Sequence, residues 1–142
     1  MQKAQKYKVV DHPADIGIIV YGKNRRELFE NSAYGMFDLM TTIEKIKPIE
    51  YFTFNLSGEN IEQLYVNFLT ELLYIHEVER VFLSEFNVDL KKVNNNYELF
   101  CIAKGEKFDI NVHERKLVIK AITYHLLEFN EKKGYAQVIF DV

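Results

Sequence analysis

Cysteine is nearly absent from this 142-residue chain, which carries only Cys101. One cysteine cannot form an internal disulfide, and it cannot build a metal site from cysteines alone within one chain. Glycine and proline are scarce, with six and two residues, and this excludes collagen-like and linker-rich architectures. No apolar run approaches the roughly 20 residues of a membrane span, and the first residues contain no apolar signal-peptide stretch. These absences predict a soluble protein of a reducing compartment, the cytoplasm.

A dominant basic charge is also missing. The chain has 18 Lys and Arg against 21 Asp and Glu, a net charge of −3, and its basic pairs are spread along the sequence. Proteins that bind nucleic acid by themselves usually present a basic face, because phosphate contacts supply most of their affinity. The composition therefore argues mildly against direct nucleic-acid binding. No glycine-rich phosphate loop or dinucleotide-binding fingerprint is found either.

What the chain does contain is typical of one globular domain, expected over residues 1–142. Hydrophobic residues make up 48% of the sequence, and 11 Phe and 9 Tyr stand beside no Trp. Phe and Tyr suit the half-buried surface of a sheet. Apolar residues recur at helical spacing after Asn24, a predicted N-cap, and again over Asn60–Arg80, which we expect to be the most buried helix.

The rest of the chain predicts strands, which we place at Tyr7–Val10, Ile16–Tyr21, Ile49–Leu56, Phe82–Asp89, Tyr97–Ala103, Leu117–Glu128 and Tyr135–Val142. Turns are expected at Asn94–Asn96 and Glu131–Gly134. The predicted fold class is therefore α+β, with two amphipathic helices packed on a mostly antiparallel sheet.

Three carboxylates stand at predicted strand ends. Asp11 and Asp15 bracket a polar turn, and Asp141 follows the last apolar strand. If that strand pairs with Ile16–Tyr21, Asp15 and Asp141 meet at one sheet edge beside the terminal carboxylate of Val142. Converging hard oxygens suit Ca²⁺ or Mg²⁺. From spacing alone, solvated turn and terminal carboxylates are the better interpretation.

Other reactive residue types give weaker signals. Cys101 lies between Phe100 and Ile102 and is interpreted as a packing residue, because reactive thiols need an electropositive, accessible setting. The four histidines lack the i, i+4 spacing of a zinc protease helix, so a zinc centre would have to be assembled across the fold. His76, late in the second helix, fits a cation favoured by the helix dipole. Gly105–His113 is predicted to be an irregular loop.

Five motifs, in order along the chain, resemble the signatures of the archease family. Asp11–Gly17 resembles that family's Asp-His-Thr-Ala-Asp-Ile-Gly, with Pro13 in place of the usual Thr. The other four are Glu27–Phe37, Leu69–Tyr74, the late stretch from Gly105 to His125, and the ending Ile139–Val142, where Val142 stands in place of a common Ile. The resemblance covers the whole chain.

The resemblance implies an expected function. Archeases are protein cofactors, not enzymes, that activate an RtcB-type RNA ligase in tRNA splicing by promoting its guanylylation and multiple turnover. They bind a divalent metal, here expected to be Ca²⁺ (or Mg²⁺), with Asp15, Asp141 and the carboxylate of Val142 as ligands. RNA would be reached only indirectly, through the ligase. Lys107 and Lys120 lie in the late signature without an assigned role.

Two other functions fit the residues themselves. A small metal-dependent phosphohydrolase could use Asp15 and Asp141, although two carboxylates without a His or Lys at ligand spacing provide few groups for an active site. A general chaperone or interaction module could use the many aromatic residues as a binding face.

Overall fold

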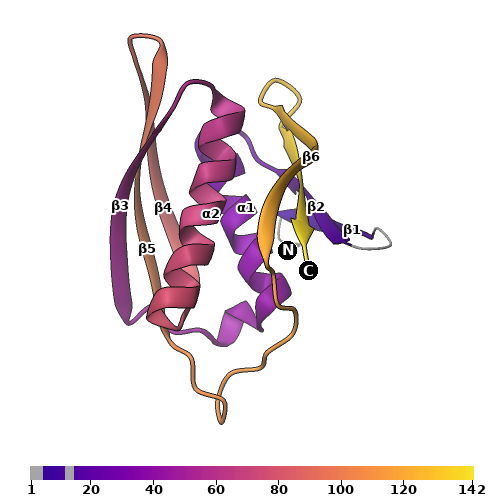
Figure 1. Ribbon diagram of the computed structural model, residues 1–142, viewed down its shortest axis with the longest axis vertical. Coiled ribbons are helices and arrows are strands. Elements are labelled where there is room, and N and C mark those ends of the chain that lie inside the picture. Colours follow the sequence, from indigo (N-terminus) through magenta and orange to yellow (C-terminus); the bar gives the residue numbers. More distant parts are fainter. Residues whose placement is uncertain (1–4, 12–14) are drawn as a thin grey trace.

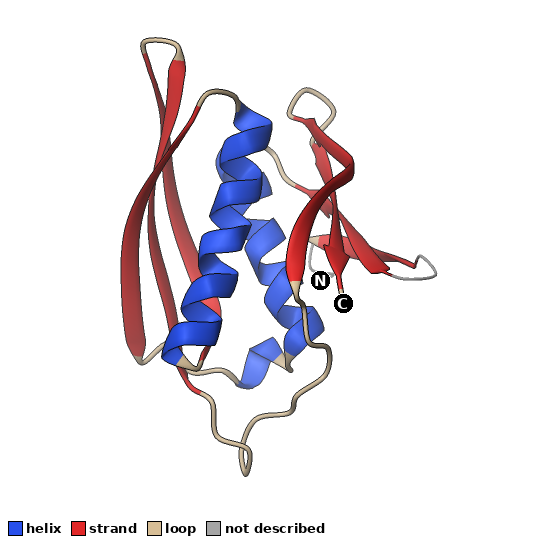
Figure 2. Ribbon diagram, viewed as in Figure 1, coloured by secondary structure: helices blue, strands red, loops and turns tan. Residues whose placement is uncertain are grey.

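Two antiparallel sheets enclose a pair of helices in the computed structural model, which describes residues 5–11 and 15–142 (Figures 1 and 2). One sheet has the strand order β1-β2-β7-β6 and the other β3-β5-β4. The elements are β1 (Tyr7–Asp11), β2 (Asp15–Tyr21), α1 (Arg25–Met40), a 3₁₀ turn (Ile43–Lys45), β3 (Glu50–Gly58), α2 (Ile61–Glu79), β4 (Val81–Val93), β5 (Asn96–Lys107), β6 (Ala121–Asn130) and β7 (Tyr135–Asp141). The predicted α+β class is confirmed, with two sheets in place of one.

Helix α1 begins where the sequence predicts. The side chain of Asn24 accepts a hydrogen bond from the N–H of Glu27 at 2.9 Å, and a Glu27 carboxylate oxygen accepts from the N–H of Lys23. These bonds satisfy backbone donors that the first helical turn leaves free. The whole predicted apolar stripe of α1 is buried, from Leu28 to Met40.

Helix α2 is also capped by an asparagine, since Asn60 accepts from the N–H of Gln63 at 2.8 Å. Its predicted stripe runs from Ile61 to Leu73. The stripe residues from Leu64 onward are buried, and Ile61 is only partly buried. However, nine of the 16 residues of α1 are buried, against eight of the 19 residues of α2. The expectation that α2 would be the most buried helix is therefore wrong. Both helices contact both sheets, but the last turn of α2, Glu77–Glu79, is exposed.

The order of the first sheet brings the end of the chain into its interior. Strand β7 lies between β2 and β6, antiparallel to both. Its core-facing residues Ala136, Val138 and Phe140 are fully buried. The same insertion places residues 15 to 21 beside residues 135 to 141, which are far apart in the sequence.

The second sheet contains one irregularity, a bulge in β4 between Leu83 and Glu85. Gly105 of β5 lies opposite this point, and a Cβ there would collide with the carbonyl oxygen of Phe82. Only glycine allows the two backbones to approach so closely. The prediction of an irregular loop over Gly105–His113 is thus partly wrong, because Gly105–Lys107 continue β5 before the loop begins.

The predicted strand Leu117–Glu128 is displaced. Strand β6 starts at Ala121 and runs to Asn130. The preceding residues run along the end of α1 instead, where the N–H groups of Lys116 and Leu117 donate to the carbonyls of Met40 and Leu39. Carbonyls in the last turn of a helix lack helical partners, so this segment satisfies them and cannot pair in the sheet.

Replacing Leu69 with Ala tests the packing of α2. Leu69 is fully buried in the core between the sheets, so its truncation leaves a cavity and should lower the free energy of unfolding by about 2–5 kcal/mol. Urea unfolding of the parent and Leu69→Ala measures the difference. A near-neutral result would mean that this face of the helix is not the core face.

Candidate metal site at the ends of β2 and β7

Asp15 and Asp141 lie directly opposite each other. In the antiparallel pairing of β2 with β7, Asp15 is the partner of Asp141 and Ile16 the partner of Phe140. Side chains of directly opposed residues project from the same face of a sheet, with Cβ atoms about 4.5–5.5 Å apart. The structure therefore brings together the two side chains that the sequence proposed as metal ligands.

The two carboxylates project from the face of the sheet that points away from the helices. Alternate residues of β2 and β7 face the core, namely Ile18 and Val20 in one strand and Val138 and Phe140 in the other. Asp15 and Asp141 fall on the opposite set of positions. On that face, Gly17 lies two residues after Asp15, and a Cβ there would collide with Cδ1 of Ile139. Gly17 thus leaves space for the side chain of Ile139, which lies on the same face of β7 as Asp141.

Strand β6 holds the other side of the site. Ala121 is the partner of Asp141 in the β6–β7 pairing, and the backbone N–H of Lys120 donates to the carbonyl of Asp141 at 2.7 Å. Asp141 is thereby fixed between two strands, and Val142, which is 36% exposed, follows it directly. The side chain of Asp141 is exposed, so the site opens to the surface.

The charges at this edge are not neutralised by the described part of the protein. Oδ1 of Asp15 is buried and has no hydrogen-bond partner among the described residues. Within residues 5–11 and 15–142, no ion pair involves Asp15 or Asp141. A buried acceptor without a partner costs free energy, and like charges placed opposite each other are destabilising. A cation between the carboxylates would remove both costs.

The oxygen donors fit a hard divalent cation such as Ca²⁺ or Mg²⁺. Two side chains alone do not complete a site, and the described residues contain no cluster of three His, Cys, Asp or Glu side chains suited to a metal. The zinc alternative therefore finds no support in that part of the chain. The expected third ligand is the main-chain carboxylate of Val142. His12, Pro13 and Ala14 of the motif lie outside the described residues.

His113, in the late motif, has a structural role: it links two parts of the segment from Glu106 to His113, an arrangement we call the His113 clamp. His113 is 6% exposed, and its Nδ1 accepts from the backbone N–H of Asp109 at 2.9 Å. Its Nε2 lies 2.8 Å from Oε1 of Glu106, which fits a proton on Nε2. Burial alone would raise the pKa of Glu106, but hydrogen bonds from the N–H of Lys47 and from His113 lower it below its usual value. Sequence reasoning missed this clamp, although both residues belong to the late motif.

The two lysines of the late motif differ in their surroundings. Nζ of Lys107 donates to the carbonyl of Glu79 at 2.9 Å and lies 3.8 Å from the Glu79 carboxylate. It therefore caps the end of α2. Lys120 is exposed and joins the site through its backbone, as described above.

Cys101 is a packing residue, as predicted. It is fully buried on β5, and burial, with a smaller contribution from Glu30, raises the pKa of its thiol to about 12. A thiol that stays protonated at neutral pH is a poor nucleophile.

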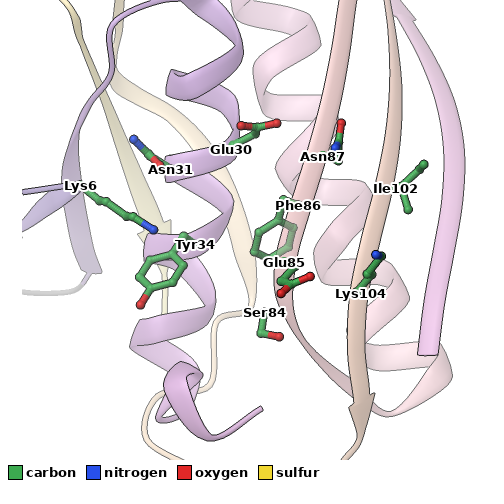
Figure 3. Close-up of a pocket in the computed structure, with 10 residues that line it drawn as sticks. All are labelled: Lys6, Glu30, Asn31, Tyr34, Ser84, Glu85, Phe86, Asn87, Ile102 and Lys104. Atoms are coloured by element: carbon green, nitrogen blue, oxygen red, sulfur yellow. The ribbon is translucent and has the colours of Figure 1, made fainter. Parts of the chain in front are cut away.

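A groove between α1 and β4, with a volume of about 430 Å³, is shown in Figure 3, and neither Asp15 nor Asp141 lines it. Its charged lining side chains have both signs, with Lys6 and Lys104 beside Glu30 and Glu85. Oε2 of Glu30 is already engaged, because it accepts hydrogen bonds from the backbone N–H of Val88 and from Arg26. The groove therefore does not extend the carboxylate site.

The fold and the site define an α+β protein with two carboxylates opposed at the ends of paired strands. Residues 7–142 match the Archease protein family. Proteins named archease from Sulfurisphaera tokodaii and Pyrococcus abyssi are 38% and 36% identical to this chain, covering 97% of it and 98% and 99% of their own lengths. The solution structure of Methanobacterium thermoautotrophicum protein 1598 matches with a TM-score of 0.85 at 31% identity, over 96% of this chain and 99% of that one. The chain belongs to the archease family.

The helices of the described residues include none that is long and apolar enough to cross a membrane. This agrees with the sequence, in which no apolar run has the length of a span.

His76 corrects an expectation and supplies a test. Its Nδ1 donates to the carbonyl of Val81 at 2.7 Å, and its ring stacks on Phe82. Burial lowers the pKa of His76, and the hydrogen bond to Val81 only partly opposes this. The folded protein therefore favours the neutral ring, and the expected role as a cation at the end of α2 is wrong.

The free energy of unfolding should fall as the pH drops from 7.5 to 5.5. A histidine in the unfolded chain takes up a proton near pH 6.5, while folded His76 resists it, so the unfolded state binds more protons in this range. Urea unfolding across the range measures the loss, which should shrink in His76→Asn and persist in His125→Gln, where the replaced histidine is exposed. An equal loss in all three proteins would contradict the role of His76.

Proposed function

We propose that this protein is a non-catalytic activator of an RtcB-type RNA ligase in cytoplasmic tRNA splicing. It would promote guanylylation of the ligase and its multiple turnover. Membership of the archease family supports the proposal, together with one observation: Asp15 and Asp141 are opposed in the β2–β7 pairing, with Oδ1 of Asp15 buried and unpartnered among the described residues.

In this proposal the carboxylates of Asp15 and Asp141, with the main-chain carboxylate of Val142, hold one divalent cation, most suitably Ca²⁺. When bound, the cation supplies a positive charge and open coordination positions at the protein surface. The chain's own residues fix its place, because β2 and β6 hold Asp141 from both sides. Asp141 is exposed, so a macromolecular partner could reach the site without a deep cleft.

The partner is a protein, and RNA is contacted only through it. The chain has a net charge of −3, and an acidic protein gains little affinity from phosphate contacts. A bound cation flanked by carboxylates would instead engage anionic or hydrogen-bonding groups of the ligase.

Asp15→Asn and Asp141→Asn should each lower ligase guanylylation and multiple-turnover RNA sealing at least about tenfold, because each removes one charged ligand of the cation. Both assays use the ligase of the same organism with GTP and the divalent metal present. Cys101→Ala is the matched control, since it changes a buried residue of the other sheet and should activate like the parent once folding is verified by circular dichroism.

The outcomes separate the competing functions. Full activation by both Asp variants would contradict the proposed site. No activation by the parent itself would contradict the proposed function. Phosphoester hydrolysis by the protein alone, lost in the Asp variants, would favour the phosphohydrolase alternative, and suppression of aggregation of unrelated proteins would favour the chaperone alternative.

A further inference from the structure

The three-stranded sheet has two edges, β3 and β4, with β5 between them. An edge strand presents unpaired backbone N–H and C=O groups, which can pair with a strand of another chain. Natural proteins protect such edges with bulges, charged side chains or a covering element. The two edges of this sheet differ in how far they are protected.

Strand β4 is protected in three ways. Helix α1 packs against it, with Glu30 on the side that faces β4 (Figure 3). The Glu30 carboxylate accepts the backbone N–H of Val88 at 2.9 Å. The bulge between Leu83 and Glu85 interrupts its regular pairing. Charged side chains also follow one another along its exposed positions, with Glu85, Asp89 and Lys91.

Strand β3 is less protected. Helix α2 packs against its inner face, but β3 has no bulge, and no side chain of the described residues is bonded to its backbone as Glu30 is to that of β4. Strand β3 runs along one side of the molecule (Figure 1), and its pairing with β5 continues without a shift from Glu50 to Gly58. Glu50, at its first position, is its only charged residue. The side chains on its outer face are exposed and uncharged, and they are Tyr51, Thr53, Asn55 and Ser57.

The inner face of β3 is incompletely covered. Phe52, Phe54 and Leu56 are only partly buried, whereas Cys101 and Ala103, on the neighbouring strand, are fully buried. Apolar side chains beside an unpaired backbone edge are what a further strand would cover.

We propose that β3 pairs with β3 of a second copy of this chain, antiparallel, about a two-fold axis at Phe54. This register pairs all nine residues of the strand, since Phe54 is its midpoint. Thr53 then faces Asn55 of the second copy, and Tyr51 faces Ser57, so no like charges are opposed. The proposal does not depend on the metal site, which lies on the other sheet.

The self-pairing also explains why the assembly would stop at two. A two-fold interface uses the same edge of both copies. The continuous six-stranded sheet would then end at β4 on both sides, where Glu30 caps the backbone. One strand pair makes a small interface, so we expect a dimer that dissociates on dilution.

Two double variants test the register. Thr53→Lys with Asn55→Lys places two Lys–Lys pairs across the axis, and should weaken dimerisation at least about tenfold. Thr53→Lys with Asn55→Glu places Lys opposite Glu twice, and should restore dimerisation to within about threefold of the parent. Both change the same two exposed positions. Sedimentation velocity over a range of concentrations measures the dissociation constant, and thermal unfolding of dilute samples confirms that both variants fold.

Restored dimerisation is specific to this register. If the two-fold axis lay at Thr53, the lysine at position 53 would face the lysine at position 53 of the second copy in both variants. A parent that stays monomeric at high concentration would overturn the proposal. So would a dimer that both variants leave unchanged, or assemblies that grow beyond two copies. Backbone amides of β3 that exchange with deuterium more slowly at higher protein concentration would support it.

Discussion

The insertion of β7 between β2 and β6 is the interaction on which the rest of the structure depends. One face of β7 supplies fully buried residues to the core, including Val138 and Phe140. Its last residue, Asp141, lies opposite Asp15. Because side chains alternate between the faces of a strand, a register shift of one residue would expose the core residues and separate the carboxylates at once. Stability and the candidate site are therefore fixed by the same backbone pairing.

The opposed carboxylates are an electrostatic cost that the described fold does not offset. No described residue neutralises them, and the Oδ1 atom of Asp15 is buried without a partner in that part of the chain. Polar groups left in this state are rare in proteins and call for an explanation. A divalent cation would supply one, and it would also place a positive charge at the exposed end of the sheet, where the proposed partner could contact it.

Much of the fold could be predicted because it depends on local patterns. The caps at Asn24 and Asn60 and the apolar stripes of both helices follow from residue type and spacing. The displaced start of β6 could not, because the N–H of Lys116 bonds to the end of a distant helix. The candidate site was only half predictable. Spacing shows carboxylates at strand ends, but their opposition depends on a long-range register, and the burial of Oδ1 of Asp15 leaves no sequence signal.

Calcium binding by the parent, Asp15→Asn, Asp141→Asn and the double variant tests the central claim most directly. If both carboxylates hold one ion, each single variant should lower the affinity measured by calorimetry, and the double variant should lose less than the sum of the two single losses, because the residues share a partner. Unchanged affinity in the single variants, or losses that add as for independent sites, would contradict a shared cation between β2 and β7.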